Sequence, residues 1–102
     1  MYKLNPSQAQ RDRGKKGAAH ELLVSYDLIL KGYDVYRAVS HNAVCDLIAI
    51  KDGRVLRVEV TTAYNYVRKD GTKCKGYNKH DTARYDVLAV VNEGSIEYYG
   101  LM

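Results

Sequence analysis

The sequence predicts a single α+β (or α/β) domain over residues 1–102, in which an N-terminal helix packs on a β-sheet. Apolar residues recur at helical spacing between residues 18 and 30, and the later segments change to the pattern of strands. Asp52-Gly53 separates two of these segments and is a strong signal for a two-residue hairpin turn. No linker-like tract divides the chain, and its length supports one modest core.

The helix is expected to begin at Ser7, a residue suited to capping, or nearer to Gly17, because Gly14 and Gly17 both disfavour helix. Lys31-Gly32 is expected to close it, as a basic last turn followed by a left-handed cap. The apolar positions that recur at helical spacing, and that should cover one face of the sheet, are Ala19, Leu22, Leu23, Tyr26, Ile29 and Leu30.

Five strands are expected, at residues 33–39, 45–51, 54–62, 86–91 and 95–99. The stretch 63–84 has no clear period and is compatible with a loop, a ragged hairpin or a short second helix. The predicted order is therefore helix, three strands, a variable segment and two strands.

Charge is unevenly distributed within a formal net charge of +4. Residues 1–17 hold five basic residues and one acid, and residues 64–84 hold six basic residues and two acids. The rest of the chain has five basic residues and nine acids. A mildly acidic body with two basic segments is typical of a protein that binds polyanions, although solvated loops would give the same pattern.

Composition excludes several classes of protein. A hydrophobic content of 46% and a charged content of 27% are those of an ordinary globular chain. No apolar run reaches the roughly 18 residues of a membrane span, and the polar N-terminus lacks the apolar core of a signal peptide. Cys45 and Cys74 have no metal or redox spacing, so free thiols in a cytoplasmic protein are expected, with a disulfide as the less favoured alternative.

The tight turn has a geometric consequence for two carboxylates. If Asp52 and Gly53 are the turn residues, Asp46 should face Glu59 across the hairpin, with their Cβ atoms roughly 4.5–5.5 Å apart. Thr61 should share their face, because side chains alternate along a strand. The opposite face is apolar and suited to burial, through Leu47, Ala49, Leu56, Val58 and Val60.

Two carboxylates that face each other need neutralisation. One can hold a proton, Arg57 on the same face can pair with one of them, or a divalent cation can bridge both. Mg²⁺ suits such a pair, since it binds one or two carboxylates together with water and phosphate oxygens. Glu21, on a helix rib with small neighbours, becomes a candidate outer ligand only together with Asp46 and Glu59.

Four short motifs resemble those of the PD-(D/E)XK nuclease superfamily. They are Gly17-Ala-Ala-His-Glu21, Lys31-Gly-Tyr-Asp-Val35, Asp46-Leu-Ile and Glu59-Val-Thr61, and the segment 85–91 is similar to the later core strand. The most similar members are the small archaeal-type Holliday junction resolvases and related phage or prokaryotic endonuclease-like domains. The resemblance implies a restriction-endonuclease-like core with a mixed central sheet.

It also implies Mg²⁺-dependent cleavage of DNA phosphodiester bonds, with Mn²⁺ as a substitute metal. A domain this small has few surfaces for recognising a duplex, so a homodimer is expected. Asp46, Glu59 and the Val60 carbonyl would hold the metal, and Glu21 would complete or orient the site through water. The sequence departs from the family pattern at two positions. Cys45 stands where the proline would be, and Thr61 stands where the catalytic lysine would be. In some members of the superfamily another polar residue fills this position, or a lysine arrives from elsewhere. Lys73, Lys75 or Lys79 could be that lysine, whereas Lys51 points to the other face.

In a nuclease of this kind the two basic segments would be expected to bind DNA. Tyrosines between residues 64 and 77 are interleaved with basic residues, a mixture suited to phosphates and exposed bases. The residues expected to bind branched or duplex DNA are Arg13, Lys15, Lys16, Arg68, Lys69, Lys73, Lys75 and Lys79. None of His20, His41 and His80 forms a pair with zinc spacing.

The leading hypothesis is a metal-dependent DNA endonuclease with Glu21, Asp46, Glu59 and Thr61 at its catalytic centre. One alternative is a nucleic-acid-binding module on the same scaffold that has lost catalysis. A second is an interaction domain in which Glu59 only pairs with Arg57.

Overall fold

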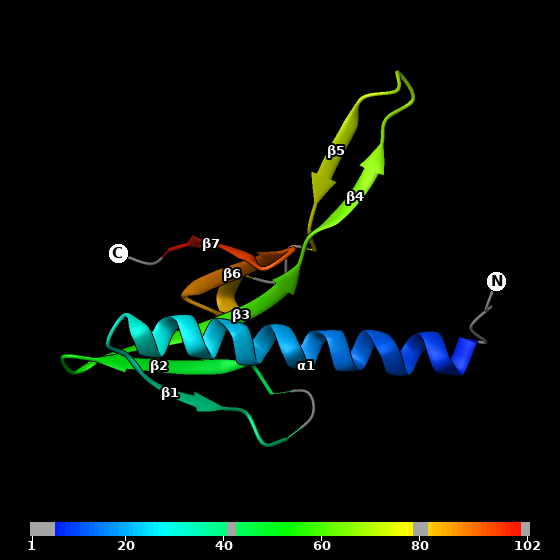
Figure 1. Ribbon diagram of the computed structural model, residues 1–102. Helices are drawn as coiled ribbons and strands as arrows, with labels where there is room; N and C mark the ends of the chain where they lie inside the picture. Colours follow the sequence, from blue (N-terminus) through cyan, green and yellow to red (C-terminus); the bar gives the residue numbers. More distant parts are fainter. Residues whose placement is uncertain (1–5, 41–42, 79–81, 101–102) are drawn as a thin grey trace.

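A computed structural model describes residues 6–40, 43–78 and 82–100, with side chains from residue 13 onward (Figure 1). One long helix is followed by seven short strands and a single 3₁₀ turn in this part of the chain. The elements are α1 (Pro6–Leu30), β1 (Asp34–Arg37), β2 (Leu47–Lys51), β3 (Arg54–Thr62), β4 (Tyr64–Val67), β5 (Lys73–Gly76), η1 (Thr82–Arg84), β6 (Val87–Asn92) and β7 (Ser95–Tyr99).

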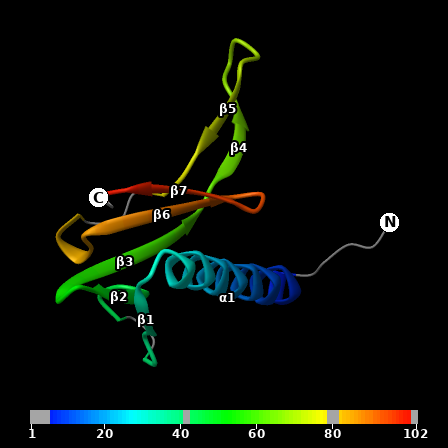
Figure 2. The ribbon, with the colours of Figure 1, turned by 60° about the vertical axis from the view of Figure 1, so that its left-hand side comes forward.

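Five strands form one sheet in the order β1-β2-β3-β6-β7, and α1 covers one of its faces. Neighbouring strands are antiparallel except for β3 and β6, which run parallel, so the sheet is mixed. The predicted helix on a mixed sheet is therefore confirmed. The variable segment forms a separate hairpin, β4–β5, which leaves the end of β3 and projects away from the body (Figures 1 and 2).

The hairpin between β2 and β3 has the expected register. Lys51 faces Arg54, and the pairing continues as far as Leu47 and Val58. Asp52 and Gly53 both have positive φ values, 51° and 76°, as a two-residue turn of this type requires. Two strands are shorter than expected. β1 covers Asp34–Arg37 instead of residues 33–39, and β2 begins at Leu47 instead of residue 45.

The helix extends further than its glycines suggested. It begins at Pro6, a residue well suited to a first helical position, and continues through Gly14 and Gly17. Its end is as expected: Gly32 has a φ of 94°, and the Tyr33 N–H donates to the Leu28 carbonyl at 3.0 Å, which is a Schellman cap.

The predicted buried face of α1 is wrong except at Leu23, which packs against the core. Val24 and Leu28 are fully buried against the sheet, whereas Leu22, Tyr26 and Ile29 are 55%, 64% and 57% exposed. The helix has apolar residues on two opposite sides, and periodicity alone cannot say which side packs. The side that packs carries Val24 and Leu28 together with Ser25, which is only 9% exposed. The apolar face expected on the sheet, Leu47, Ala49, Leu56, Val58 and Val60, does line this core.

Two polar contacts tie α1 to the ends of the sheet. The Tyr98 hydroxyl of β7 donates to the Asp27 carboxylate, which also accepts from Lys31 at 2.7 Å. These two donors lower the pKa of Asp27. Nearer the other end, His20 Nδ1 lies 2.7 Å from Thr62 Oγ1 at the end of β3.

The Tyr98 contact gives a test of how the helix is held. Tyr98→Phe should lower the free energy of unfolding by about 1–2 kcal/mol, because it leaves a half-buried carboxylate with one donor fewer. Tyr99→Phe is the matched control: its hydroxyl donates to Glu97 at 2.8 Å in an exposed position, so its loss should cost less than about 0.5 kcal/mol. Urea denaturation measures both, and equal effects would contradict this role of Tyr98.

Candidate functional site

Asp46 lies where the regular ladder between β2 and β3 ends. Its backbone N–H donates to the Val58 carbonyl at 3.1 Å, although Val58 is the register partner of Leu47. Two successive residues of one strand therefore face one residue of the other, as in a β-bulge. The Asp46 carboxylate then takes the place of the missing ladder partner, and its Oδ2 accepts the Val60 N–H at 2.8 Å.

Glu59 lies on the face of β3 opposite to the one that packs against α1, and it is only 7% exposed. Its carboxyl hydrogen-bonds the Asp46 carboxyl. Burial, this hydrogen bond and the Asp46 charge raise the pKa of Glu59 to about 8. The structure thus brings the two predicted carboxyls together, although through a bulge rather than through a regular cross-strand pair.

Arg57 does not neutralise this pair, contrary to one of the alternatives. Its guanidinium binds Asp86, with Nη2 3.0 Å from Oδ1 and Nε 3.2 Å from Oδ2. The arginine holds the pKa of Asp86 down to about 2. The interpretation in which Glu59 only pairs with Arg57 is therefore wrong, because Asp86, which directly precedes β6, takes this cation.

Glu21, on α1, interacts with Asp46 through its charge. Burial and the charge of Asp46 raise its pKa, while Arg37 lowers it. Within the residues that the structure describes, no three His, Cys, Asp or Glu side chains are grouped closely enough to hold a metal ion. The directly assembled acidic site is the pair Asp46 and Glu59, and Glu21 is a neighbour on α1.

Thr61 shares the face of Glu59 and is 8% exposed, so its side chain lies on the same side of the sheet as the carboxyl pair. Of the lysines considered as its replacement, the two that the structure describes belong to the projecting hairpin. Lys73 and Lys75 lie on β5, in the projecting hairpin (Figure 1), and Lys79 is outside the described residues. Lys51 lies at the opposite end of β2, where its Nζ donates to the Lys31 carbonyl.

Sequence reasoning did not single out Arg84, a basic residue that the fold brings to the pair. Its charge lowers the pKa of Glu59, against the larger effect of burial. Its Nη2 donates to the Ala43 carbonyl at 3.2 Å, three residues before Asp46. Arg84 lies in the stretch without a period, so the sequence had assigned it no strand and no face.

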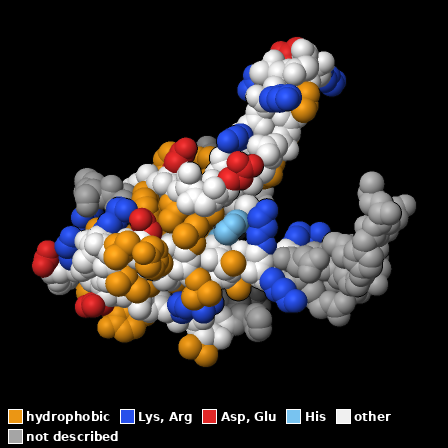
Figure 3. Space-filling model, viewed as in Figure 1, with side chains coloured by type: hydrophobic (Ala, Val, Ile, Leu, Met, Phe, Trp, Pro, Cys, Tyr) orange, Lys and Arg blue, Asp and Glu red, His pale blue; other side chains and the backbone are white. Residues whose placement is uncertain are grey.

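Basic side chains gather at two places beyond the site. Arg13, Lys15 and Lys16 are exposed on α1, and others cover the hairpin, as Figure 3 shows. Both the N-terminal part of α1 and the hairpin extend past the end of β3 (Figures 1 and 2). His41 and His80 lie outside the described residues.

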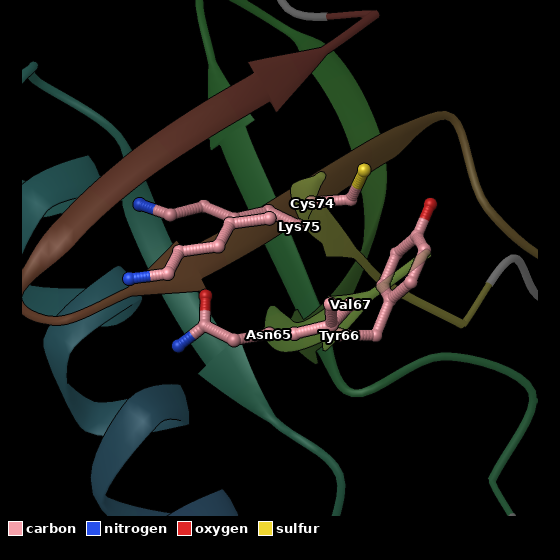
Figure 4. A pocket seen from close by; sticks show the side chains of 6 residues that line it. Asn65, Tyr66, Val67, Cys74 and Lys75 are labelled. Atoms are coloured by element: carbon pink, nitrogen blue, oxygen red, sulfur yellow. The ribbon is translucent and has the colours of Figure 1, made fainter. Parts of the chain in front are cut away.

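The hairpin has two different faces. The register places Tyr64, Tyr66 and Cys74 on one face and Asn65, Val67, Lys73 and Lys75 on the other. The rings of Tyr64 and Tyr66 lie 6.0 Å apart. Side chains of both strands border a hollow of about 460 Å³, shown in Figure 4. Both cysteines of the chain are free, as expected.

The donor set fits a divalent cation. Glu59 is shielded from water, and among the described residues neither Asp46 nor Glu59 forms a salt bridge, so the pair must keep a proton or bind a cation. Mg²⁺ is commonly held by one or two carboxylates and retains several waters, so Asp46 and Glu59 are sufficient protein ligands. The Val60 carbonyl is one residue beyond Glu59 and remains a candidate ligand.

The raised pKa of Glu59 predicts an unusual pH dependence of stability. The folded chain keeps a proton on Glu59 that the unfolded chain releases at ordinary carboxyl pH, so the free energy of unfolding should fall as the pH rises toward about 8. Glu59→Gln removes this contribution, so the variant should gain stability relative to the wild type across that window. Denaturation in chelator at a series of pH values measures the difference. Glu97→Gln, an exposed change, is the control, and parallel curves for Glu59→Gln and the wild type would contradict the prediction.

Among the described residues, no helix has both the length and the apolar character that crossing a membrane requires. No protein-family model matches the chain. The fold is similar to that of a bacterial homing endonuclease, I-Ssp6803I, with a TM-score of 0.68 at 14% sequence identity, over 84% of this chain and 67% of that one. The chain thus has the fold of a known nuclease.

Similarity at the level of sequence extends to a phage protein. Protein 5.3 of Escherichia phage T7 is 33% identical over 86 residues, which cover 78% of this chain and 73% of the phage protein. The chain therefore belongs to the family of protein 5.3 of Escherichia phage T7.

Proposed function

We propose that this protein is a metal-dependent DNA endonuclease of the PD-(D/E)XK type. The observation that carries the proposal is the interaction of the Asp46 carboxyl with the buried Glu59 carboxyl at the end of a tight hairpin. The fold that holds the pair is shared with a homing endonuclease. A narrower form of the proposal is selectivity for branched DNA, as in the Holliday junction resolvases that the motifs resemble.

Asp46 and Glu59 would hold Mg²⁺ or Mn²⁺, with the Val60 carbonyl as a further ligand and Glu21 acting through water. A bound divalent cation supplies charge neutralisation and a water of lowered pKa. The protein's own contribution is to fix the carboxylates. The bulge and the Val60 N–H hold Asp46, and burial in the sheet holds Glu59.

The two basic regions would hold the DNA backbone on either side of the end of β3. On α1 these residues are Arg13, Lys15 and Lys16, and on the hairpin they are Arg68, Lys69, Lys73 and Lys75, with Lys79 beyond the described part. A two-stranded ribbon is narrow enough for the DNA major groove. An isolated hairpin is marginally stable in water, so contact with DNA would also order it.

A homodimer would allow each copy to cut one strand of a duplex. The side of α1 that faces away from the sheet supports this proposal, because Leu22, Tyr26, Ile29 and Leu30 are exposed there over more than two turns. A second copy would shelter these side chains from water.

A DNA-binding module without catalysis is the second candidate. Thr61 favours it, because a hydroxyl supplies no positive charge for the transition state. Cleavage assays separate the two candidates, since the module would bind DNA in a salt-dependent manner and leave it intact in Mg²⁺ and Mn²⁺.

Asp46→Asn and Glu59→Gln should each reduce cleavage by more than about 100-fold, because a metal ligand is worth several kcal/mol in the transition state. DNA binding should change little, because neither side chain is basic. The substrates are a four-way junction, a duplex and a single strand, each with Mg²⁺, Mn²⁺ or chelator. Equal loss of binding and thermal stability in both variants would instead favour a structural role, and an inactive wild type would favour the binding module.

Removing hairpin charges should weaken DNA binding in a salt-dependent way. With Lys73→Gln/Lys75→Gln, the plot of log K against log salt should become shallower by about 0.9 for each phosphate that the variant no longer neutralises. Lys51→Gln/Arg54→Gln removes the same charge at the opposite turn and should leave the slope nearly unchanged. Fluorescence anisotropy over a salt series measures both, and equal slopes for the two double variants would contradict a special role of the hairpin.

A further inference from the structure

The segment before β6 lies against the same face of the sheet as the carboxyl pair. The backbone N–H of Asp86 donates to the Arg57 carbonyl at 2.9 Å, and the Asp86 carboxylate accepts the Arg57 N–H at 2.8 Å. Arg57 Nη1 donates to the Ala83 carbonyl, also at 2.9 Å. Arg57 and Glu59 are two residues apart on β3, so their side chains share a face. The residues on both sides of Arg84 are therefore fixed to the strand that carries Glu59.

The other end of Arg84 is also held. Its guanidinium donates to the Ala43 carbonyl at 3.2 Å, in the segment that leads into Asp46. The side chain thus spans from the η1 turn, fixed to β3, to the chain that enters β2. These are the two strands that supply the carboxyls, and the positive charge of Arg84 influences Glu59. A guanidinium has five N–H donors, and the contact with the Ala43 carbonyl uses Nη2.

We propose that Arg84 is a catalytic residue that contacts the phosphate to be cut and supplies the positive charge that Thr61 lacks. This inference rests on the proposed endonuclease function. Hydrolysis forms a bond from a water oxygen to phosphorus and breaks the bond from phosphorus to a sugar oxygen. The water loses a proton and the leaving oxygen gains one. Negative charge grows on the phosphate oxygens during this step, and a guanidinium matches their geometry with two parallel hydrogen bonds.

Single-turnover cleavage at saturating enzyme tests the proposal in Mg²⁺ and in Mn²⁺. Arg84→Ala should slow cleavage by about 10²–10³-fold, the usual cost of losing one donor to the transition state. Arg84→Lys should retain an intermediate rate, because it keeps the charge but not the forked geometry. DNA affinity should change less than about threefold in both variants, because the contact is made mainly in the transition state. Arg54→Ala, another exposed arginine near Asp86, is the matched control and should cleave at the wild-type rate.

Chemical rescue separates catalysis from positioning of the Ala43 segment. Free guanidinium at millimolar concentration should restore part of the rate of Arg84→Ala and leave Arg54→Ala unchanged. If Arg84→Ala cleaves at the wild-type rate, the proposed endonuclease function stands, whereas the role of Arg84 is overturned. A lower rate together with a lower melting temperature, without rescue, would also overturn it, in favour of a structural role. An inactive wild type would overturn both the endonuclease and the role of Arg84.

Discussion

The site depends on the two-residue turn at Asp52-Gly53. Because the turn allows no slack, it sets the register of β2 and β3 as far as Leu47 and Val58. A slip of one residue would move every side chain of one strand to the other face, and would place Glu59 in the apolar core. The same register therefore buries Leu56 and Val58 under α1 and aims Glu59 at the opposite face. Core packing and the geometry of the site are specified by one short turn.

Placing Glu59 on this face beside Asp46 costs folding free energy. The sheet shields a carboxyl from water next to another carboxyl, and Arg57, two residues before Glu59 on the same strand, is bound to Asp86 instead. Burying a carboxyl without a counter-ion favours its neutral form, which is why the pKa of Glu59 rises. A protein selected for stability alone would gain by placing an apolar residue at this position. The retained pair is consistent with a site that gives up stability in exchange for binding a cation.

The sequence predicted best what local chemistry decides. Asp52-Gly53 predicted the β2–β3 hairpin, and Gly32 predicted the end of α1. Both features depend on positive φ angles that these residues adopt themselves. The buried side of α1 was not predictable, since Val24 and Leu28 compete with an equally apolar stripe on the other side. Arg84 was not predictable either. Its place depends on the Arg57–Asp86 pair, a contact between residues 29 positions apart that no period reveals.

The position of Arg84 also changes how the basic excess should be understood. The two basic segments extend outward, one along α1 and one along the hairpin (Figure 1), whereas the basic residue whose charge acts on Glu59 is Arg84. In the proposed endonuclease, long-range attraction of DNA and local stabilisation of charge would therefore be separate tasks. Exposed lysines can perform the first from a distance, because steering needs only net charge. Local stabilisation of charge needs a donor that can contact a phosphate bound beside Asp46 and Glu59. The Arg84 guanidinium, in a segment held at both ends, would meet that requirement better than a lysine on the projecting hairpin.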